Sequence, residues 1–396
     1  MKKKKTYQHS DEEQSGGVRG LFARMRGDYD VQSGRGTPDM ILLATVTGLV
    51  LFGLVMIASA GSIYGDYRFG DAYYFFKQQL VGVGIGFLLL FLLQGVDYHL
   101  FRRWALLIFL GAIALLVAVL MPGLGIEAYG AQRWISVGGT SFQPAEAVKL
   151  ATVLYISAWS ASKSSKHLTD TMEGFVPFFI TLSCVSFLIV LQPDVGTMVV
   201  VALTAVVIFF LAGAHIKHIV ALFLMGCGAL AALIVAAPYR LERFTTFLDP
   251  AADAQDAGYQ IIQALIAIGS GGLAGLGLGA SRQKALYLPE PVGDSIFAII
   301  AEELGLWGSF IVLALFAVLL WRIIRIARRA PDVFGRLVVA GIGVWLIGQA
   351  MMNVAAITSL MPLTGIPLSF ISFGGTAMVF ALAAIGIVLN VSRYAK

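Results

Sequence analysis

The sequence predicts an all-α integral membrane protein with about ten transmembrane helices, for two reasons. Of the 396 residues, 58% are hydrophobic and only 13% are charged, and the mean hydropathy is +0.83. Soluble globular domains do not have this composition. In addition, apolar runs long enough to cross a bilayer recur from residue 40 to the end of the chain.

Hydropathy places the spans between short polar or Gly/Pro-containing connections. The segment 177–212 is read either as two spans or as one kinked hairpin. The predicted spans are 40–60, 79–94, 103–121, 145–159, 175–191, 195–212, 219–237, 295–321, 337–358 and 376–391.

The distribution of basic residues orients these spans. Most of the 28 Lys and Arg residues fall on alternate connections, and the densest group is Arg322 to Arg329. The positive-inside rule then places both termini in the cytoplasm and Asp294 on the outer side. Residues 1–39, polar and basic with Lys2 to Lys5 in a row, are predicted to form a disordered cytoplasmic tail. Residues 40–396 are predicted to form one membrane domain, with a large extracytoplasmic loop (238–294) between spans seven and eight.

Several common chemistries have no signature in the chain. The two cysteines, Cys184 and Cys227, lie in apolar runs and read as small packing residues. The sequence contains no C-x-x-C, H-E-x-x-H, P-loop or dinucleotide-binding motif, and nothing points to nucleic acid. These observations predict neither a metal site nor a nucleotide cofactor.

The strongest candidate site lies where the large loop enters span eight. Asp294 stands at that boundary, and Glu302 and Glu303 follow inside the apolar run. Ionisable groups in such places are costly and are therefore functional candidates. The alternative for Asp294 is an N-cap of the following helix, since Asp is a favoured capping residue. The two roles are compatible.

A second group of candidates lies in the outer connection 122–143 and the helix that follows it. This connection carries Arg133 and Trp134, and Gln143 precedes a helix that bears Glu146 and Lys149. The last two residues share a helical face, so they form either a structural ion pair or part of a cavity.

The large loop carries positive charge on the side where basic residues are otherwise scarce, at Arg243, Arg282 and Lys284. Its Gly-rich run, 269–279, is read either as flexible backbone or as a source of amides for a phosphate, and flexibility is the commoner explanation.

Five blocks of the sequence, in order, resemble the SEDS (shape, elongation, division and sporulation) family, which comprises FtsW, RodA and SpoVE proteins. The blocks are GAQRWISVGGTSFQPAEAVKL, QPDVGT, RFTTFLDPAADAQDAGYQIIQALIAIGSGG, SRQKALYLPEP with the following D–IFAIIAEELG, and LTGIPLSFISFGG. The resemblance covers essentially everything after Met40 and is nearest to the division and sporulation branch. One departure is Val292-Gly293 before Asp294, where the family usually has His-Thr or Gln-Thr.

This resemblance implies a peptidoglycan glycosyltransferase that polymerises lipid II during septal wall synthesis in the bacterial cytoplasmic membrane. Asp294 would be the base that deprotonates the acceptor hydroxyl. The residues expected to bind substrate are Arg133, Trp134, Gln143, Glu146, Lys149, Arg243, Arg282, Lys284 and Glu302, with or without a divalent cation (Mg²⁺ or Mn²⁺). The implied partners are an FtsI-like class B penicillin-binding protein, whose single span would dock near the last two spans, and other divisome membrane proteins.

Three other functions remain open on the sequence. The intramembrane charges at Glu146, Lys149, Glu302 and Glu303 also suit a lipid II flippase or transporter. An elongation-type polymerase of the RodA kind and a noncatalytic scaffold of the division machinery are the remaining alternatives.

Overall fold

The computed structural model describes residues 36–128, 131–137, 140–236, 238–250 and 258–395. The predicted disordered tail, residues 1–39, therefore lies almost entirely outside the described residues. Residues 37–395 belong to one compact unit, and all that follows concerns this unit.

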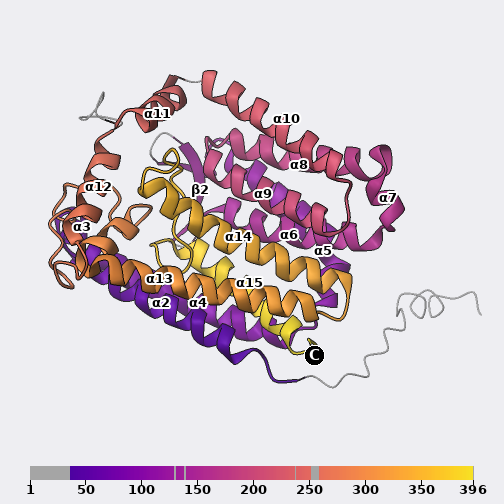
Figure 1. The fold of residues 1–396 in the computed structure, drawn as a ribbon, viewed down its shortest axis with the longest axis horizontal. Coiled ribbons are helices and arrows are strands. Elements are labelled where there is room, and N and C mark those ends of the chain that lie inside the picture. The colour runs from indigo at the N-terminus through magenta and orange to yellow at the C-terminus, as the bar shows by residue number, and fades with distance from the viewer. Residues whose placement is uncertain (1–35, 129–130, 138–139, 237, 251–257, 396) are drawn as a thin grey trace, which may run out of the picture. The chain divides into compact units, whose positions relative to one another are not determined.

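The described chain is mostly helical, which confirms the predicted all-α membrane class (Figure 1). The helices are α2 (Met40–Ala60), α3 (Ser62–Phe69), α4 (Tyr74–Gly95), α5 (His99–Val119), α6 (Pro144–Ser162), α7 (Ser165–Thr169), the π-helical turn η1 (Thr171–Phe175), α8 (Val176–Val190), α9 (Val195–Leu211), α10 (Ile216–Val235), α11 (Pro238–Leu248), α12 (Tyr259–Gly271), α13 (Ile296–Arg329), α14 (Val333–Ile357) and α15 (Gly375–Ser392).

Eight helical stretches of the described chain are long and apolar enough to cross a membrane, with η1 and α8 counted as one. The other two predicted spans correspond to α6, which carries Glu146 and Lys149, and to α9, which has only 17 residues. All ten predicted spans are thus helices, while the number of crossings and the side of each terminus stay predictions. Below, the end of the unit that carries Asp294 is called the outer end, after the predicted orientation.

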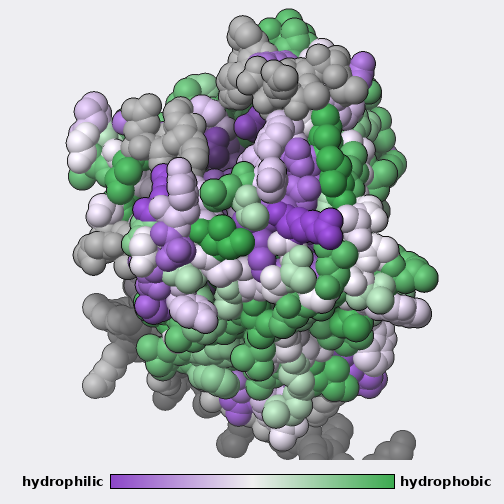
Figure 2. Space-filling view, turned by 90° about the vertical axis from the view of Figure 1, so that its left-hand side faces the viewer, coloured by the Kyte–Doolittle hydropathy of each residue, from purple (hydrophilic) through white to green (hydrophobic). Residues whose placement is uncertain are grey.

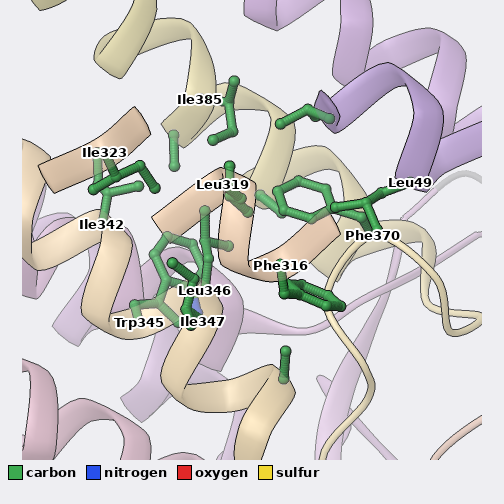
Figure 3. Close-up of a cluster of buried hydrophobic side chains, with 14 of the residues drawn as sticks. Leu49, Phe316, Leu319, Ile323, Ile342, Trp345, Leu346, Ile347, Phe370 and Ile385 are labelled. Atoms are coloured by element: carbon green, nitrogen blue, oxygen red, sulfur yellow. The ribbon is translucent and has the colours of Figure 1, made fainter. Parts of the chain in front are cut away.

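The centre of the bundle is formed by α14 and α15, the most buried of the candidate spans. Figure 3 shows this core, where Trp345 of α14 and Ile385 of α15 meet Phe316 of α13 and Leu49 of α2. Small residues allow the close helix packing that membrane interiors favour. A Cβ at Gly386 of α15, for example, would approach within 2.6 Å of the Leu90 carbonyl oxygen of α4.

The connection between α5 and α6 contains a three-stranded antiparallel sheet that the sequence analysis did not predict. Its strands are β1 (Gly125–Ala128), β2 (Ala131–Val137) and β3 (Thr140–Phe142), in the order β1-β2-β3. In its register Trp134 pairs with Ile126 and Ile135 pairs with Phe142, so aromatic and β-branched residues oppose one another.

The Gly-rich run after α12 is packed against the bundle, so the expectation of a flexible backbone is wrong. Two of its amides are hydrogen-bonded within the protein and are not available to a phosphate. The run packs against the outer part of α13, where Gly305 has φ +67° and interrupts the helix. The amides of Leu276 and Gly277 donate to the carbonyl oxygens of Glu302 and Glu303, at 2.9 Å each. These carbonyls lose their helical partners at the break, so the glycine run supplies the missing donors.

Two glycines of α12 provide a test of this packing. A Cβ at Gly271 would overlap the carbonyl oxygen of Ala301, whereas nothing lies within 4 Å of a Cβ at Gly269. We expect Gly271→Ala to lower the thermal stability of the purified protein, with an overpacking cost of about 1–3 kcal/mol. Gly269→Ala should leave stability unchanged or raise it slightly, because alanine favours helix. Equal melting temperatures for the two variants would contradict the packing role.

Candidate active site

Asp294 lies at the outer end, two residues before α13 begins, and it is partly buried. It lines a small hollow with Asn353 of α14 and with residues 363–366. The latter belong to the loop between α14 and α15 (358–374), called the last outer loop below. The Asp294 segment is therefore enclosed by elements that are distant in sequence.

The Asp294 carboxylate does not cap α13. Its Oδ1 accepts a hydrogen bond from Gln260 Nε2 of α12 at 3.2 Å, and the same nitrogen donates to Ser295 Oγ at 3.0 Å. Ser295 occupies the N-cap position and makes no side-chain capping bond. The capping alternative is wrong in this structure, and the side chain that could have capped the helix faces Gln260 instead.

The surroundings of Asp294 raise the pKa of its carboxyl group to about 6. The main cause is burial, which disfavours the charged form, and the negative charge of Glu290 adds to it. The hydrogen bond from Gln260 and the positive charge of Arg243 act in the opposite direction but are weaker. A carboxylate with such a pKa is a better base near neutral pH than an ordinary aspartate.

The backbone around Asp294 is held by side chains as well. Asn353 Nδ2 donates to the carbonyl oxygens of Asp294 at 2.8 Å and of Ile366 at 2.9 Å. Ser372 Oγ donates to the Gly293 carbonyl oxygen at 2.7 Å. The segment that carries the carboxylate is thus tied to α14 and to the last outer loop.

Glu302 and Glu303 lie about two turns into α13 and bind the part of the large loop that precedes this helix. Glu303 Oε1 accepts from Lys284 Nζ at 2.9 Å and from Ser59 Oγ of α2 at 2.8 Å. Glu302 accepts from the amide of Arg282 at 3.0 Å and from the hydroxyl of Ser281. Glu302, Glu303 and Lys284 are at most 4% exposed. Buried charges require such partners, so we reassign Glu302 and Lys284 from substrate contacts to supports of the loop.

Arg133 of β2 is a support as well. Its Nε donates to the Gln192 carbonyl oxygen at 2.8 Å, and Nη2 donates to that of Pro193 at 2.5 Å. These bonds fasten the sheet to the turn between α8 and α9. Nearby, Trp134 is half-buried on the same strand, and Gln143 Nε2 lies 3.5 Å from Asp194 Oδ2.

The predicted pair of Glu146 and Lys149 is present and buried. Lys149 Nζ lies 2.7 Å from Glu146 Oε1 and donates to Gln349 Oε1 of α14 at 2.8 Å. The same nitrogen lies 5.4 Å from the centre of the Trp345 ring. Glu146 also lines a small cavity with Gln349, residues 367–370 and Ser372. The two earlier alternatives, an ion pair and a cavity residue, therefore both hold.

Helix α14 links the pair of Glu146 and Lys149 to the Asp294 segment, because Gln349 binds Lys149 and Asn353 binds the Asp294 carbonyl. Gln349 and Asn353 lie one turn apart on α14, and their amide nitrogens donate to the adjacent carbonyls of Pro367 and Ile366. The last outer loop thus connects the two charged groups.

Of the predicted cationic residues, Arg243 and Arg282 have exposed side chains. Both belong to the large loop at the outer end, where Figure 2 shows strongly hydrophilic residues among hydrophobic ones. In the described ranges no group of three or more His, Cys, Asp or Glu side chains is placed to hold a metal ion. We derive no step through a cation.

The sequence analysis missed the amide side chains that organise this site, namely Gln79, Gln260, Gln349 and Asn353. Gln79 of α4 is fully buried and binds the Ser372 carbonyl and the Gly374 amide. Three of the four lie inside predicted spans, where any polar group needs a partner. Amides within apolar runs were the available signal, but within the predicted spans only ionisable residues had been considered.

Fold and site together define a polytopic membrane protein that carries Asp294, a partly buried carboxyl group with a raised pKa, at its outer end. The family model for the cell cycle proteins FtsW, RodA and SpoVE matches residues 39–396, and the chain belongs to this family.

Curated relatives and solved structures agree with this assignment. The chain is 44% identical to stage V sporulation protein E of Bacillus subtilis, over 91% of this chain and 98% of that protein. It is 39% identical to a probable peptidoglycan glycosyltransferase FtsW of Geobacter sp. (strain M18), over 89% and 96%.

Among solved structures, one reported for the structural coordination of polymerization and crosslinking by a peptidoglycan synthase complex matches with a TM-score of 0.74 and 28% identity, covering 90% of this chain and 98% of that chain. The rod shape determining protein RodA of Thermus thermophilus matches with a TM-score of 0.66 and 27% identity, covering 92% and 98%.

The buried pair gives a testable expectation. Lys149→Met leaves the Glu146 carboxylate buried without its cation, and such losses cost about 3–5 kcal/mol. We expect a large drop in thermal stability for this variant and for Glu146→Leu, and recovery in the double variant Glu146→Leu/Lys149→Met. Turnover of the double variant then separates the roles. Normal turnover would make the pair purely structural, and lost turnover in a stable protein would make it part of the site.

Proposed function

We propose that this protein is a peptidoglycan glycosyltransferase that polymerises lipid II, the undecaprenyl-pyrophosphate-linked disaccharide-pentapeptide, at the outer side of the cytoplasmic membrane. The observation that carries the proposal is Asp294, a carboxylate at the outer end with a raised pKa and no capping role. Relatives of similar length are named probable peptidoglycan glycosyltransferases, which supports this reading.

The chemistry asks little more of the protein than one base. The pyrophosphate is already a good leaving group, so no strong acid is needed. Asp294 takes the proton of the acceptor hydroxyl as its oxygen attacks the anomeric carbon of the donor. The bond to the pyrophosphate breaks, and the configuration at that carbon inverts.

Positive charge near the leaving pyrophosphate would stabilise the transition state. Arg243 and Arg282 are suited to this task because their side chains are exposed. Arg243 also acts electrostatically on Asp294. Arg133, Lys149 and Lys284 are suited less well, since their cationic groups are already bound to protein oxygens.

We further propose an FtsI-like class B penicillin-binding protein as the partner and the division septum as the location. The solved complex that coordinates polymerization with crosslinking supports the first point, and the sequence similarity to FtsW relatives supports the second.

Two glycines of α14 face α9 inside the bundle. A Cβ at Gly341 would lie 2.6 Å from Ile208 of α9, whereas a Cβ at Gly348 would lie 3.6 Å from Leu203 of the same helix. Gly341 is therefore required for close packing on α9, and an added methyl group at Gly348 would make only ordinary contact.

The catalytic assignment is tested by Asp294→Asn. We expect loss of lipid II polymerisation by the purified protein with its cognate partner, because asparagine cannot act as the base. Asn keeps the size and the capping ability of Asp. The matched control is Asp332→Asn, a capping aspartate at the other end of the bundle that accepts from the amides of Phe334 and Gly335. The assignment fails if Asp294→Asn polymerises lipid II at a near-normal rate.

The pH dependence gives a second test. Since the pKa of Asp294 is raised to about 6, the base is protonated below that pH and free above it. We expect kcat/KM to rise with pH through about 6 and then level off, because kcat/KM reports groups of the free enzyme. Glu290→Gln removes a negative charge that raises this pKa. Its profile should therefore move to lower pH, and a profile that stays in place or moves upward would contradict the model.

A further inference from the structure

Two amide side chains contact Asp294, one at its carboxylate and one at its backbone carbonyl, and nothing in the proposed chemistry uses them. Gln260 lies on α12 in the large outer loop and contacts the carboxylate. Asn353 lies on α14 in the core of the bundle and contacts the backbone carbonyl. The two residues come from different helices, and both contact the Asp294 segment.

Helix physics makes another position of the Asp294 side chain attractive. Helix α13 begins at Ile296 without a side-chain cap. Its first amides carry partial positive charge and lack partners within the helix. An aspartate directly before such an end ordinarily turns toward these amides. There, the hydrogen bonds would favour its charged form and make it a weaker base.

Gln260 holds the carboxylate away from that position. Its Nε2 bridges Asp294 Oδ1 at 3.2 Å and Ser295 Oγ at 3.0 Å, so one donor occupies both groups that could cap α13. Both acceptors lie at the junction between loop and helix.

Asn353 fixes the backbone that carries the side chain. Its Nδ2 donates to two carbonyls, which settles the orientation of the amide, and the residue is 2% exposed. With the carbonyl of Asp294 held against α14, the residue cannot rotate freely about the flexible Gly293 that precedes it.

We propose that Gln260 and Asn353 are positioning residues that keep Asp294 out of the helix cap and directed toward the acceptor. This inference rests on the assignment of Asp294 as the base. It predicts that the two amides sustain turnover by preventing a local arrangement that would be at least as stable as the observed one.

The decisive variant is Gln260→Ala, with Gln263→Ala as its control. Gln263 lies on the same helix, and within the described residues it makes no side-chain hydrogen bond to the Asp294 segment. Without Gln260, Asp294 is expected to turn to the amides of α13. We expect kcat to fall about 10- to 100-fold, as for a misplaced catalytic group, with little change in KM and no loss of thermal stability. The pH profile of kcat/KM should move to lower pH.

The direction of that pH shift separates the proposal from a plain loss of a hydrogen bond. The bond from Gln260 lowers the pKa of Asp294, so its removal alone would move the profile to higher pH. An upward shift, an unchanged kcat, or a loss of activity matched by an equal loss of stability would each overturn the role of Gln260.

For Asn353 the chain offers a close control in Asn390 of α15. Asn390 is 1% exposed and also joins two backbone groups, the Gln94 carbonyl and the Tyr98 amide, but at the cytoplasmic end. Asn353→Ala and Asn390→Ala should lose similar thermal stability, while only Asn353→Ala loses about tenfold or more in kcat. Equal turnover of the two variants would overturn the role of Asn353.

Asp294→Asn, measured beside these variants, distinguishes failure of the base assignment from failure of the positioning proposal. If it retains turnover, the base assignment itself fails. If it is inactive while Gln260→Ala and Asn353→Ala keep full activity, the base assignment stands and the positioning proposal falls.

Discussion

The structure of the outer end is determined by the free-energy cost of burying carboxylates without partners. Glu302 and Glu303 lie in an apolar helix, where an unpartnered charge would be strongly destabilising. The chain meets this requirement by folding the loop before α13 back onto the helix, so that Lys284, Ser281 and backbone amides reach the two carboxylates. Ser59 of α2 adds a further donor. The acidic pair therefore determines where the loop runs before it reaches Asp294 and α13.

The Asp294 carboxylate, in contrast, has few hydrogen-bond partners. It receives one side-chain hydrogen bond and has a raised pKa, although the start of α13, which has no side-chain cap, lies beside it. A fold selected for stability alone would satisfy the first amides of this helix with the nearest carboxylate. The observed arrangement instead preserves basicity, a common compromise where catalysis and stability compete. The same region thus contains two kinds of acidic residue. Glu302 and Glu303 have their hydrogen-bonding needs met and support the loop, whereas Asp294 has fewer partners, as suits the base that we propose it to be.

The sequence predicted the membrane class, the helices and the charged residues at the outer end, because hydropathy and charge are local properties of the chain. Asp294 and the pair of Glu146 with Lys149 were recognisable for the same reason. The supporting contacts were not, since they join residues far apart, such as Arg133 with Gln192 or Asn353 with Asp294. The glycine run was misread as flexible because only the packed structure reveals the break in α13 that it covers.

The break at Gly305 also separates α13 into two helices, so the directions of side chains around the axis in one part do not determine those in the other. In an unbroken helix every residue sets the direction of the next by about 100°, so the residues at the far end of α13 would dictate the orientation of residues 296–304. The positive φ of Gly305 removes that dependence. The membrane-spanning part can change its length, tilt or face toward lipid over evolution, while the short outer helix keeps its own alignment on α12 and the orientation of Asp294 remains the same.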